Sequence, residues 1–299
     1  MELLSRLREA QRLRSFRWLS SSDGDQVALA RLEQQMSWFY GNQDARKRYQ
    51  EMLSDERAAA IDPGSPPAEL LLELIRTTTS GSYVLEVGCA HGRLYQALRE
   101  RGFAGRYLGV DMAEHVIGDN RRRFSDADWQ LGSAHRLAFP DATFDHAFAY
   151  YVLEHLVYVE KGLIEMMRVL KPGGELLLVF PDFVAKGMLS SQFLGLSPGR
   201  SARNKLRAGH PLDAALSLYD SRIRLQRHLA ALESVGRFPV NTAPICLSHP
   251  EVMEADVDAL YIASKREVEE WALKRGHRVR YPAGTSGTFR DNAFMAIAR

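Results

Sequence analysis

Between residues 83 and 180, short apolar runs alternate with amphipathic stretches of helical period. The apolar run that begins at Tyr83 predicts a first strand with Glu86 at its end. Further runs predict strands at Arg106–Asp111, His146–Tyr150 and Glu175–Phe180, which we number second, fourth and fifth. Such alternation is typical of βαβ units and therefore of a parallel sheet with helices on both faces. In sheets of this kind, ligands bind at the carboxyl ends of the strands.

The turn after the first strand combines an acid with two glycines, in the order Glu86, Gly88 and Gly92. Glycines lack a Cβ, so the backbone can approach a ligand closely. The helix that follows would point its N-terminal amides at polar ligand atoms. A carboxylate at Glu86 suits a ligand with an amino group or cation and would repel a pyrophosphate. The turn therefore predicts a nucleotide site and disfavours a plain dinucleotide enzyme.

The second strand ends in Asp111, about 20 residues past the glycines, where an acid accepts hydrogen bonds from ribose hydroxyls. Together, Glu86, Gly88, Gly92 and Asp111 resemble the S-adenosylmethionine (SAM) site of class I methyltransferases of the methyltransferase-11 or UbiE-like type. The chain departs from that family twice. Ser133 stands where the family has an acid for the adenine amino group, and Ala90 replaces the middle glycine of the turn.

The resemblance covers roughly residues 80–182 and again the last thirty, through Gly132–Asp145, Tyr151–Leu156 and Arg168–Gly174. It implies a Rossmann-like α/β fold whose seven-stranded sheet is mostly parallel, with the last strand inserted antiparallel between the fifth and sixth. It also implies SAM as the cofactor. The residues that the resemblance assigns to the cofactor are Glu86, Gly88, Cys89, Ala90, Gly92, Asp111, Met112, Ser133, Ala134 and Tyr150.

Around this core, composition breaks predict four regions: an N-terminal helical extension or lid at 1–79, the SAM-binding core at 80–182, a helical cap insertion at 183–255, and a C-terminal part at 256–299. The last part is predicted to supply a helix at Lys265–Arg275, the sixth strand at His277–Tyr281 and the seventh at Ala293–Ala298, thereby completing the core.

The N-terminal extension is predicted to be helical. Residues 1–22 carry five arginines and two glutamates, a local charge of +3, among leucines and aromatic residues. Such a basic amphipathic helix can lie on an anionic membrane, but most dock on their own domain, and we favour that interpretation. A second helical stretch runs from about Asp25 to Leu53, and a third occupies residues 68–78. The aromatic cluster Trp38–Tyr40 could be core, or it could fold over the cofactor so that Tyr40 and Tyr49 face the acceptor.

The insertion at 183–255 breaks the alternation of strands and helices. It predicts helices near Leu189–Leu194 and from about Leu212 to Val235, followed by irregular chain from Cys246 to Pro250. Because loops at the carboxyl edge often carry substrate recognition, we favour a substrate cap over a surface for a homodimer. The proposed apolar walls are Phe183, Met188, Leu189, Phe193 and Tyr219.

The predicted chemistry is transfer of an activated methyl group by in-line displacement, for which alignment in a dry pocket matters most. Where the acceptor is a hydroxyl, a phenol or an acidic carbon, a base helps, and His155 follows the fourth strand at the right place. Tyr40 or Tyr151 could orient it. The alternative is that His155 is a packed residue beneath the cofactor. The other histidines show no pairing at helical spacing, so no metal site is predicted.

Composition narrows the substrate class. The 299 residues carry 39 basic and 37 acidic side chains, a formal charge of +2, which does not indicate nucleic-acid binding. Two cysteines exclude a disulfide framework and favour a reducing cytoplasm. No apolar stretch has the length of a membrane span, and no secretory signal is expected. We expect a small-molecule acceptor methylated at oxygen, nitrogen or an activated carbon. A macromolecular acceptor, or an inactive SAM-fold partner subunit, is the alternative.

Overall fold

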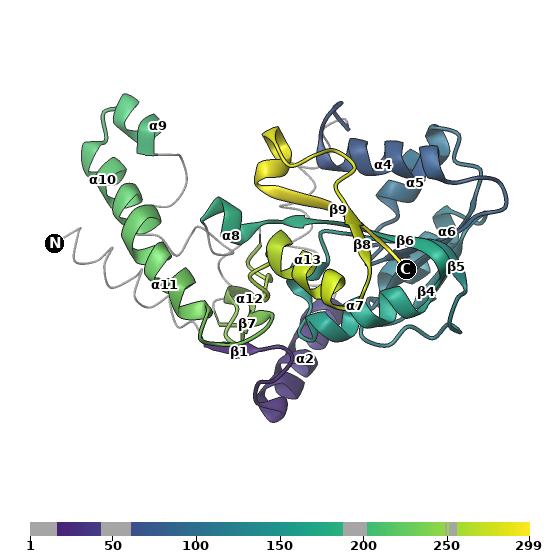
Figure 1. Cartoon of the computed structure of the whole chain (residues 1–299), viewed down its shortest axis with the longest axis horizontal. Helices are drawn as coiled ribbons and strands as arrows, with labels where there is room; N and C mark the ends of the chain where they lie inside the picture. Colours follow the sequence, from purple (N-terminus) through teal and green to yellow (C-terminus); the bar gives the residue numbers. More distant parts are fainter. Residues whose placement is uncertain (1–16, 43–60, 188–201, 249, 251–255) are drawn as a thin grey trace.

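The computed structural model describes residues 17–42, 61–187, 202–248, 250 and 256–299 (Figure 1). Its centre is a seven-stranded sheet in the order β4-β3-β2-β5-β6-β9-β8. The strands are β2 (Tyr83–Val87), β3 (Arg106–Asp111), β4 (Asp128–Leu131), β5 (Phe144–Tyr150), β6 (Leu170–Pro181), β8 (Arg278–Arg280) and β9 (Asn292–Ala298).

The strand directions confirm the predicted fold class. β4, β3, β2, β5 and β6 run parallel, whereas β9 pairs antiparallel with both β6 and β8. The last strand is thus inserted between the fifth and the sixth, as predicted. Because β2, β3 and β5 are parallel, their last residues, Val87, Asp111 and Tyr150, reach the same edge of the sheet.

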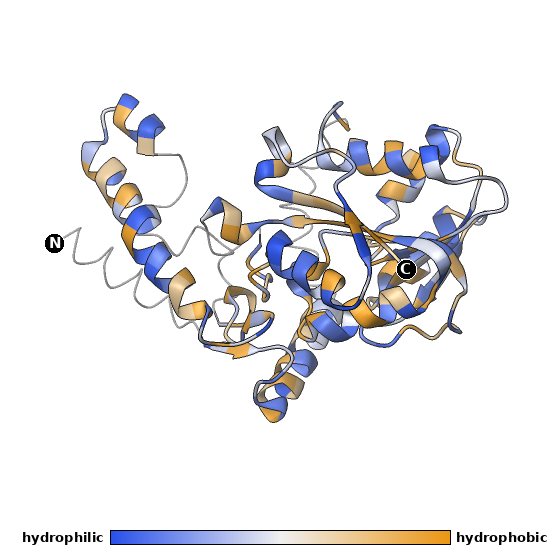
Figure 2. Ribbon diagram, in the orientation of Figure 1, coloured by the Kyte–Doolittle hydropathy of each residue, from blue (hydrophilic) through white to orange (hydrophobic). Residues whose placement is uncertain are grey.

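Helices cover both faces of the sheet, as Figure 1 shows. One face packs α4 (Pro66–Thr77), α5 (Arg93–Glu100) and Ile117 of α6 (Glu114–Arg123) around Val84 and Phe148. The other packs α2 (Gln26–Gly41), α7 (Val159–Arg168) and α13 (Lys265–Lys274) around Leu85 and Ala147. Consecutive strand residues point to opposite faces, so a continuous apolar run serves both layers. The strands accordingly appear as apolar ribbons between amphipathic helices in Figure 2.

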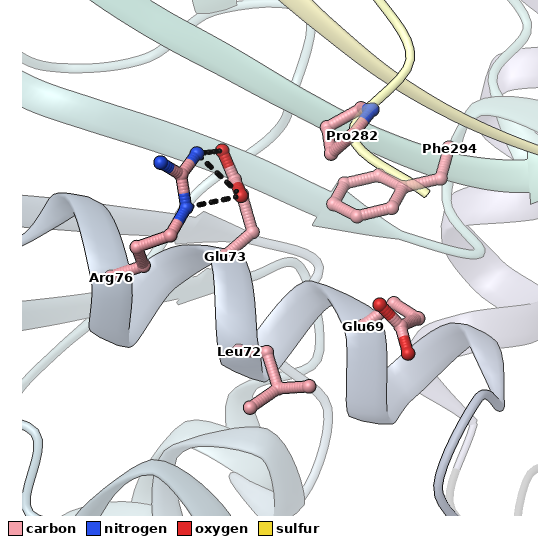
Figure 3. Close-up of a pocket in the computed structure, with 6 residues that line it drawn as sticks. All are labelled: Glu69, Leu72, Glu73, Arg76, Pro282 and Phe294. Carbon is pink, nitrogen blue, oxygen red and sulfur yellow. Dashed lines mark hydrogen bonds and ion pairs between the residues drawn. The ribbon is translucent and has the colours of Figure 1, made fainter. Parts of the chain in front are cut away.

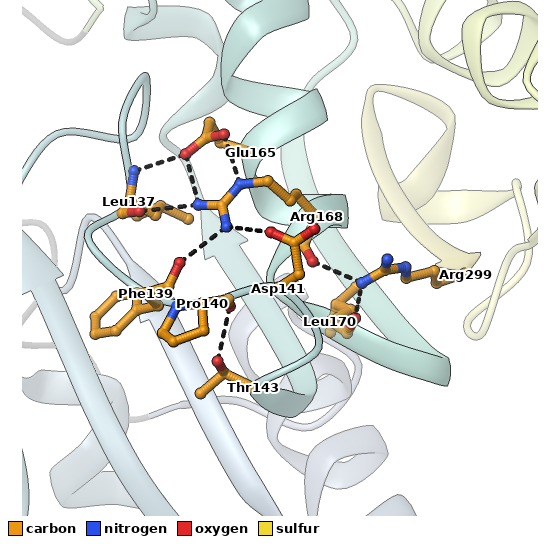
Figure 4. Close-up of polar contacts among 9 residues, drawn as sticks. All are labelled: Leu137, Phe139, Pro140, Asp141, Thr143, Glu165, Arg168, Leu170 and Arg299. Atoms are coloured by element: carbon orange, nitrogen blue, oxygen red, sulfur yellow. Dashed lines mark hydrogen bonds and ion pairs between the residues drawn. The ribbon is translucent and has the colours of Figure 1, made fainter.

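The arginine at the end of α7 fixes this helix to the chain that enters β5 (Figure 4). Arg168 Nη2 donates to the carbonyl of Leu137 (2.9 Å), and Nη1 donates to the carbonyl of Phe139 and to Asp141 (both 2.8 Å). Glu165, one turn earlier, receives two further bonds from the same guanidinium. This planar fork therefore holds three carbonyl or carboxylate groups of one loop against one helix.

The N-terminal prediction is wrong for the residues after 16. Trp18–Ser20 form a strand, β1, rather than part of a basic helix, and pair antiparallel with β7 (Pro239–Asn241) of the insertion. Buried Val240 and Phe238 supply the apolar side of this small sheet. Residues 1–16, which hold most of the basic pattern, lie outside the described residues.

The insertion contains more elements than predicted: α8 (Phe183–Lys186), α9 (Ala202–Arg207), α10 (Pro211–Tyr219), a π-helical segment η3 (Asp220–Arg224), α11 (Leu225–Leu232) and α12 (Ile245–Ser248). The predicted helix from Leu212 to Val235 is confirmed in α10 to α11. The expected irregular chain from Cys246 is wrong in part, because Ile245 and Cys246 are buried within α12. The helix expected near Leu189–Leu194 lies outside the described residues.

Several boundaries differ from the prediction. α4 begins at Pro66, two residues before the predicted start, since proline is tolerated in the first turn of a helix. β6 begins at Leu170 rather than at Glu175. Its pairing with β5 changes register between Leu170, which lies opposite Phe144, and Glu175, which lies opposite His146. α2 ends at Gly41, and the rest of the stretch predicted to Leu53 lies beyond the described residues. Short 3₁₀ turns at Leu153–His155 (η1) and Gly287–Arg290 (η4) complete the fold.

Candidate cofactor and acceptor site

The turn predicted after the first strand follows β2, and its backbone is left-handed at three positions. Gly88 has φ +75°, Gly92 has φ +68°, and Ala90 between them has φ +41°. The amides of Gly88 and Cys89 both donate to the carbonyl of Val110, at 2.8 and 3.0 Å, so the turn is fixed to the end of β3. Ala90 therefore keeps the turn in the form that a glycine would allow.

The two glycines also make room for neighbouring side chains, a requirement that the sequence did not reveal. A Cβ on Gly88 would overlap Val152 Cγ2 and lie 3.3 Å from Cγ1, while a Cβ on Gly92 would lie 2.8 Å from Trp129 Cη2. Gly88 thus lets the chain after β5 pack directly on the turn. Val152 precedes His155 by three residues, so the segment that carries the predicted base starts at the turn.

Asp111 lies at the junction of the turn and β3. Its Oδ2 accepts from the amide of Ala90 and its Oδ1 accepts from the amide of Ala113, both at 3.0 Å. Asn120 holds the other side of the turn by donating to the carbonyl of Ala90 at 2.6 Å. A carboxylate oxygen can accept more than one hydrogen bond, so Asp111 fits as the acceptor for a ligand that donates from vicinal hydroxyls.

Glu86 is buried (3% exposed) and receives a hydrogen bond from the hydroxyl of Tyr107. Burial raises the pKa of Glu86 to about 8, so its carboxyl is largely neutral at neutral pH. Glu86 itself stays a predicted cofactor residue.

The loop predicted to hold adenine is tied to α2. Ser133 Oγ accepts from the amide of His135 at 3.2 Å, and His135 Nδ1 lies 3.0 Å from Glu33 Oε1 of α2. Ala134 packs against the core on the α2 face, and Met112, half-buried, directly follows Asp111. The N-terminal helix thus contacts the same loop to which the resemblance assigns adenine.

A second polar cluster forms where β5 ends. Tyr40 Oη of α2 donates to Asp258 Oδ2 at 3.0 Å. His155 Nδ1 lies 3.3 Å from the carbonyl oxygen of Asp258 and 3.6 Å from its Oδ2. Tyr40 and His155 also contact each other edge to face, with ring centroids 6.4 Å apart. Asp258, 2% exposed, is therefore the link between two predicted catalytic residues, and the sequence did not indicate it.

Glu154 contacts this cluster through both its backbone and its side chain. Its carbonyl accepts from the amides of Leu260 (2.8 Å) and Tyr261 (3.0 Å), which fixes the segment that carries Asp258. Its side chain is fully buried, and neither carboxyl oxygen has a hydrogen-bond partner among the described residues. Burial raises the pKa of Glu154 to about 7. Burial alone would lower the pKa of His155, but the carboxyl groups of Asp258 and Glu154 outweigh it and raise that pKa.

Tyr151 does not join this cluster. It has a strained φ of +51° and donates to Asn292 Oδ1 at 3.0 Å, at the start of β9. It packs on the α4 face, and Tyr150 stacks against it edge to face with centroids 4.6 Å apart. The expectation that Tyr151 orients His155 is therefore wrong, since a different face of the sheet holds its hydroxyl.

Residues 85–178 match the methyltransferase domain family designated Methyltransf_11. This span runs from the first strand to the fifth and contains the turn, Asp111 and His155. These residues are a class I methyltransferase domain. The cofactor of such domains is SAM.

Curated relatives match over the same region. A demethylmenaquinone methyltransferase of Symbiobacterium thermophilum is 35% identical over 102 residues, covering 31% of this chain and 40% of that protein. A ubiquinone/menaquinone biosynthesis C-methyltransferase of Hydrogenovibrio crunogenus is 30% identical over 120 residues, covering 38% of this chain and 47% of that protein. The chain thus spans less than half the length of these relatives. Among solved structures, a SAM-dependent methyltransferase of Mesorhizobium loti aligns over 79% of this chain and 99% of its own at 13% identity, with a TM-score of 0.49.

Outside this edge of the methyltransferase domain, the described residues form a shallow hollow between α4 and the start of β9 (Figure 3). It has a volume of about 180 Å³, and the ion pair of Glu73 and Arg76 lies on its rim. None of the predicted site residues lines it, so it is separate from the cofactor edge. Within the described parts of the chain, no three histidine, cysteine or acidic side chains are arranged to hold a metal ion, and no helix is long and apolar enough to cross a membrane.

Proposed function

We propose that this protein transfers a methyl group from SAM to a small-molecule acceptor at oxygen, nitrogen or an activated carbon. One observation supports the proposal: β2 and β5 are parallel, so the glycine turn after β2 and the chain that leads to His155 after β5 start from the same edge of the sheet, where Val152 packs on Gly88. A cofactor held by the turn and an acceptor at the cluster would be neighbours there.

The cofactor would be held by the backbone of residues 88–92, by Asp111 through ribose hydroxyls, and by Ser133 or its carbonyl near the adenine amino group. When bound, SAM supplies a methyl group on a sulfonium that is already activated for displacement. The buried setting of Asp111, 7% exposed, supports its assignment, since hydrogen bonds to a charged acceptor are stronger where water is excluded.

His155 would act as the base for acceptors that carry a proton. The carbonyl oxygen and Oδ2 of Asp258 near Nδ1 are both acceptors, which favours the tautomer with the proton on Nδ1. The lone pair is then on Nε2, which lies 3.8 Å from Glu154 Oε1. Asp258 and Glu154 would then stabilise the imidazolium that forms, in the way a carboxylate supports a catalytic histidine. Asp258 is thus a positioning residue, and Tyr40 orients its carboxylate from α2.

The small-molecule class rests on the near-neutral charge of the chain and on relatives named for quinone biosynthesis. We propose that α2, with Tyr40, borders the acceptor. We also propose that the insertion sets acceptor identity, although Phe183 is a buried core residue and Tyr219 lies on the exposed face of a helix. Met188, Leu189, Phe193 and Tyr49 lie outside the described residues.

The first test is binding of S-adenosylhomocysteine by calorimetry, followed by a methyl-transfer screen with labelled SAM against metabolites, total RNA and total protein. Binding with transfer to a metabolite is the expected result. Binding of neither cofactor form in the folded protein would favour the inactive partner subunit. Transfer to RNA or protein alone would replace the small-molecule acceptor.

The second test concerns the base. His155→Gln should lower kcat by about 100-fold or more for a proton-bearing acceptor, while S-adenosylhomocysteine affinity stays near the parent value. Asp258→Asn should lower the pKa of His155, because one of the carboxylates that raises it is removed. The rising limb of the pH–rate profile should therefore move to lower pH, with a reduced plateau. Tyr151→Phe is the matched control, since Tyr151 faces Asn292. An unchanged profile in Asp258→Asn would remove the positioning role.

A further inference from the structure

The helical hairpin of residues 202–232, which we call the arm, extends away from the sheet in Figure 1. It consists of α9, α10, η3 and α11. Leu225 and Leu229 pack its base against the core. Toward its tip, the buried side chains of the described arm are only Lys205 and Ala214, so these helices do not use an apolar face to dock on their own domain.

Large apolar side chains on the arm face solvent instead. Five of the twelve large exposed apolar side chains among the described residues belong to it: Leu206, Leu212, Leu218, Tyr219 and Ile223, at 42–61% exposure. Leu212 and Tyr219 are seven residues apart, and Tyr219 and Ile223 four, so they share one helix face. Figure 2 shows apolar positions recurring along these helices. Such a concentration marks an interaction surface rather than scattered surface leucines.

The charges around this face have one sign. The exposed charged side chains of the arm are Arg203, Arg207, Arg222 and Arg227. Its two acids are half-buried: Asp220 pairs with Arg224 at 3.1 Å, and the charge of Asp213 acts on the buried Lys205. The nearest exposed acid, Glu233, follows the arm at its base. Among the described residues of the arm, the exposed charged side chains that accompany the apolar face are therefore all arginines.

We infer that the arm is an interfacial docking surface for an anionic membrane. An apolar face flanked by arginines matches the boundary between acyl chains and acidic headgroups, where the apolar side chains insert and the cations meet phosphates. A second copy of this chain fits less well, because a symmetric interface would bring arginines against arginines. The inference does not depend on the proposed chemistry, since no residue of the arm is assigned to the cofactor, to His155 or to Asp258, although Tyr219 is also among the proposed acceptor walls.

Vesicle flotation with the full-length protein tests this inference. The protein should float with phosphatidylcholine vesicles that contain phosphatidylglycerol, weakly with pure phosphatidylcholine, and less as ionic strength rises. The double variant Arg222→Gln with Arg227→Gln should bind the anionic vesicles about 30-fold more weakly, at roughly five-fold for each arginine. Tyr219→Ser with Ile223→Ser should weaken binding by about ten-fold.

Matched controls remove equivalent groups elsewhere. Leu273→Ser removes an exposed leucine from α13 and Arg266→Gln an exposed arginine, and neither should change flotation. All variants alter exposed side chains, and circular dichroism checks their folding. Absence of flotation, equal flotation with both lipids, or full binding by both arm variants would overturn the inference. So would a dimer in sedimentation that the Tyr219 and Ile223 changes dissociate, or an acidic protein that binds the arm while vesicles do not.

Discussion

Gly88 offers the sharpest test of how the turn and the chain after β5 depend on each other. Its φ of +75° disfavours any side chain, and a Cβ would overlap Val152 Cγ2 and lie 3.3 Å from Cγ1 and 3.4 Å from Cβ. Rotation about χ1 can move Cγ2 away, but Cβ of Val152 stays 3.4 Å from the added methyl group, so a close contact remains. Gly88→Ala must therefore displace Val152, through its side chain or its backbone.

The expected cost has two parts. Holding an alanine at positive φ costs about 1–2 kcal/mol, and forcing an extra methyl into a filled site costs about 1–3 kcal/mol. Gly88→Ala should thus lower the free energy of unfolding by about 2–5 kcal/mol. Gly102→Ala is the matched control, since Gly102 has φ +80° and no heavy atom within 4 Å of its Cβ position. Gly102→Ala should lower the free energy of unfolding only by the cost of holding an alanine at positive φ.

Val152→Ala separates the two parts further. It removes both γ carbons, so the double variant with Gly88→Ala should regain most of the steric part while the cost of positive φ remains. Urea unfolding of the parent, Gly88→Ala, Val152→Ala and the double variant gives the complete double-mutant cycle. The reasoning would be refuted if Gly88→Ala and Gly102→Ala lowered the free energy of unfolding equally. It would also be refuted if the changes in this free energy for Gly88→Ala and Val152→Ala were strictly additive in the double variant. Folded Gly88→Ala should also show reduced methyl transfer, because His155 follows the displaced segment.

Three further outcomes are expected. Asp111→Ala should weaken S-adenosylhomocysteine binding by about 1–3 kcal/mol in calorimetry; an unchanged affinity in the folded variant would remove Asp111 from the cofactor site. Glu154 has its pKa raised from 4.5 to about 7 by burial, so the stability it contributes is complete below pH 4.5 and is lost as pH rises through 7. In urea unfolding, the free energy of unfolding should decline by about 3 kcal/mol less between pH 4.5 and 7 in Glu154→Gln than in the parent. The exposed Glu100→Gln should leave this pH dependence unchanged. Arg168→Lys should cost about 1–3 kcal/mol of unfolding free energy, because an ammonium cannot span Glu165 and the two loop carbonyls; Arg266→Lys, an exposed pair, should stay within about 0.5 kcal/mol.

The central sheet could be predicted because its strands carry their own signal. A parallel strand is buried on both faces, so the first two strands appear as short apolar runs. The run Arg106–Asp111 matches β3 to the residue, and the run that starts at Tyr83 contains β2. The turn could be predicted because its glycines are a local signal: glycine favours tight turns, and Gly88 and Gly92 both have left-handed backbone in the structure. By contrast, β1 and β7 are three residues each and pair across more than 200 positions, too short for any period to appear.

Asp258 was missed for a different physical reason. It reaches His155 because the amides of Leu260 and Tyr261 donate to the carbonyl of Glu154, and backbone bonds of this kind can be made by nearly any residue. These backbone bonds leave no recognisable pattern in the sequence around Asp258. Its partners Tyr40 and His155 lie 218 and 103 positions away in the chain. What the sequence did show was the chemistry of the end of β5, where a histidine follows an acid. The tertiary fold then determines which distant carboxylate supports that histidine, so an Asp at position 258 becomes interpretable only once the carbonyl of Glu154 has fixed its segment.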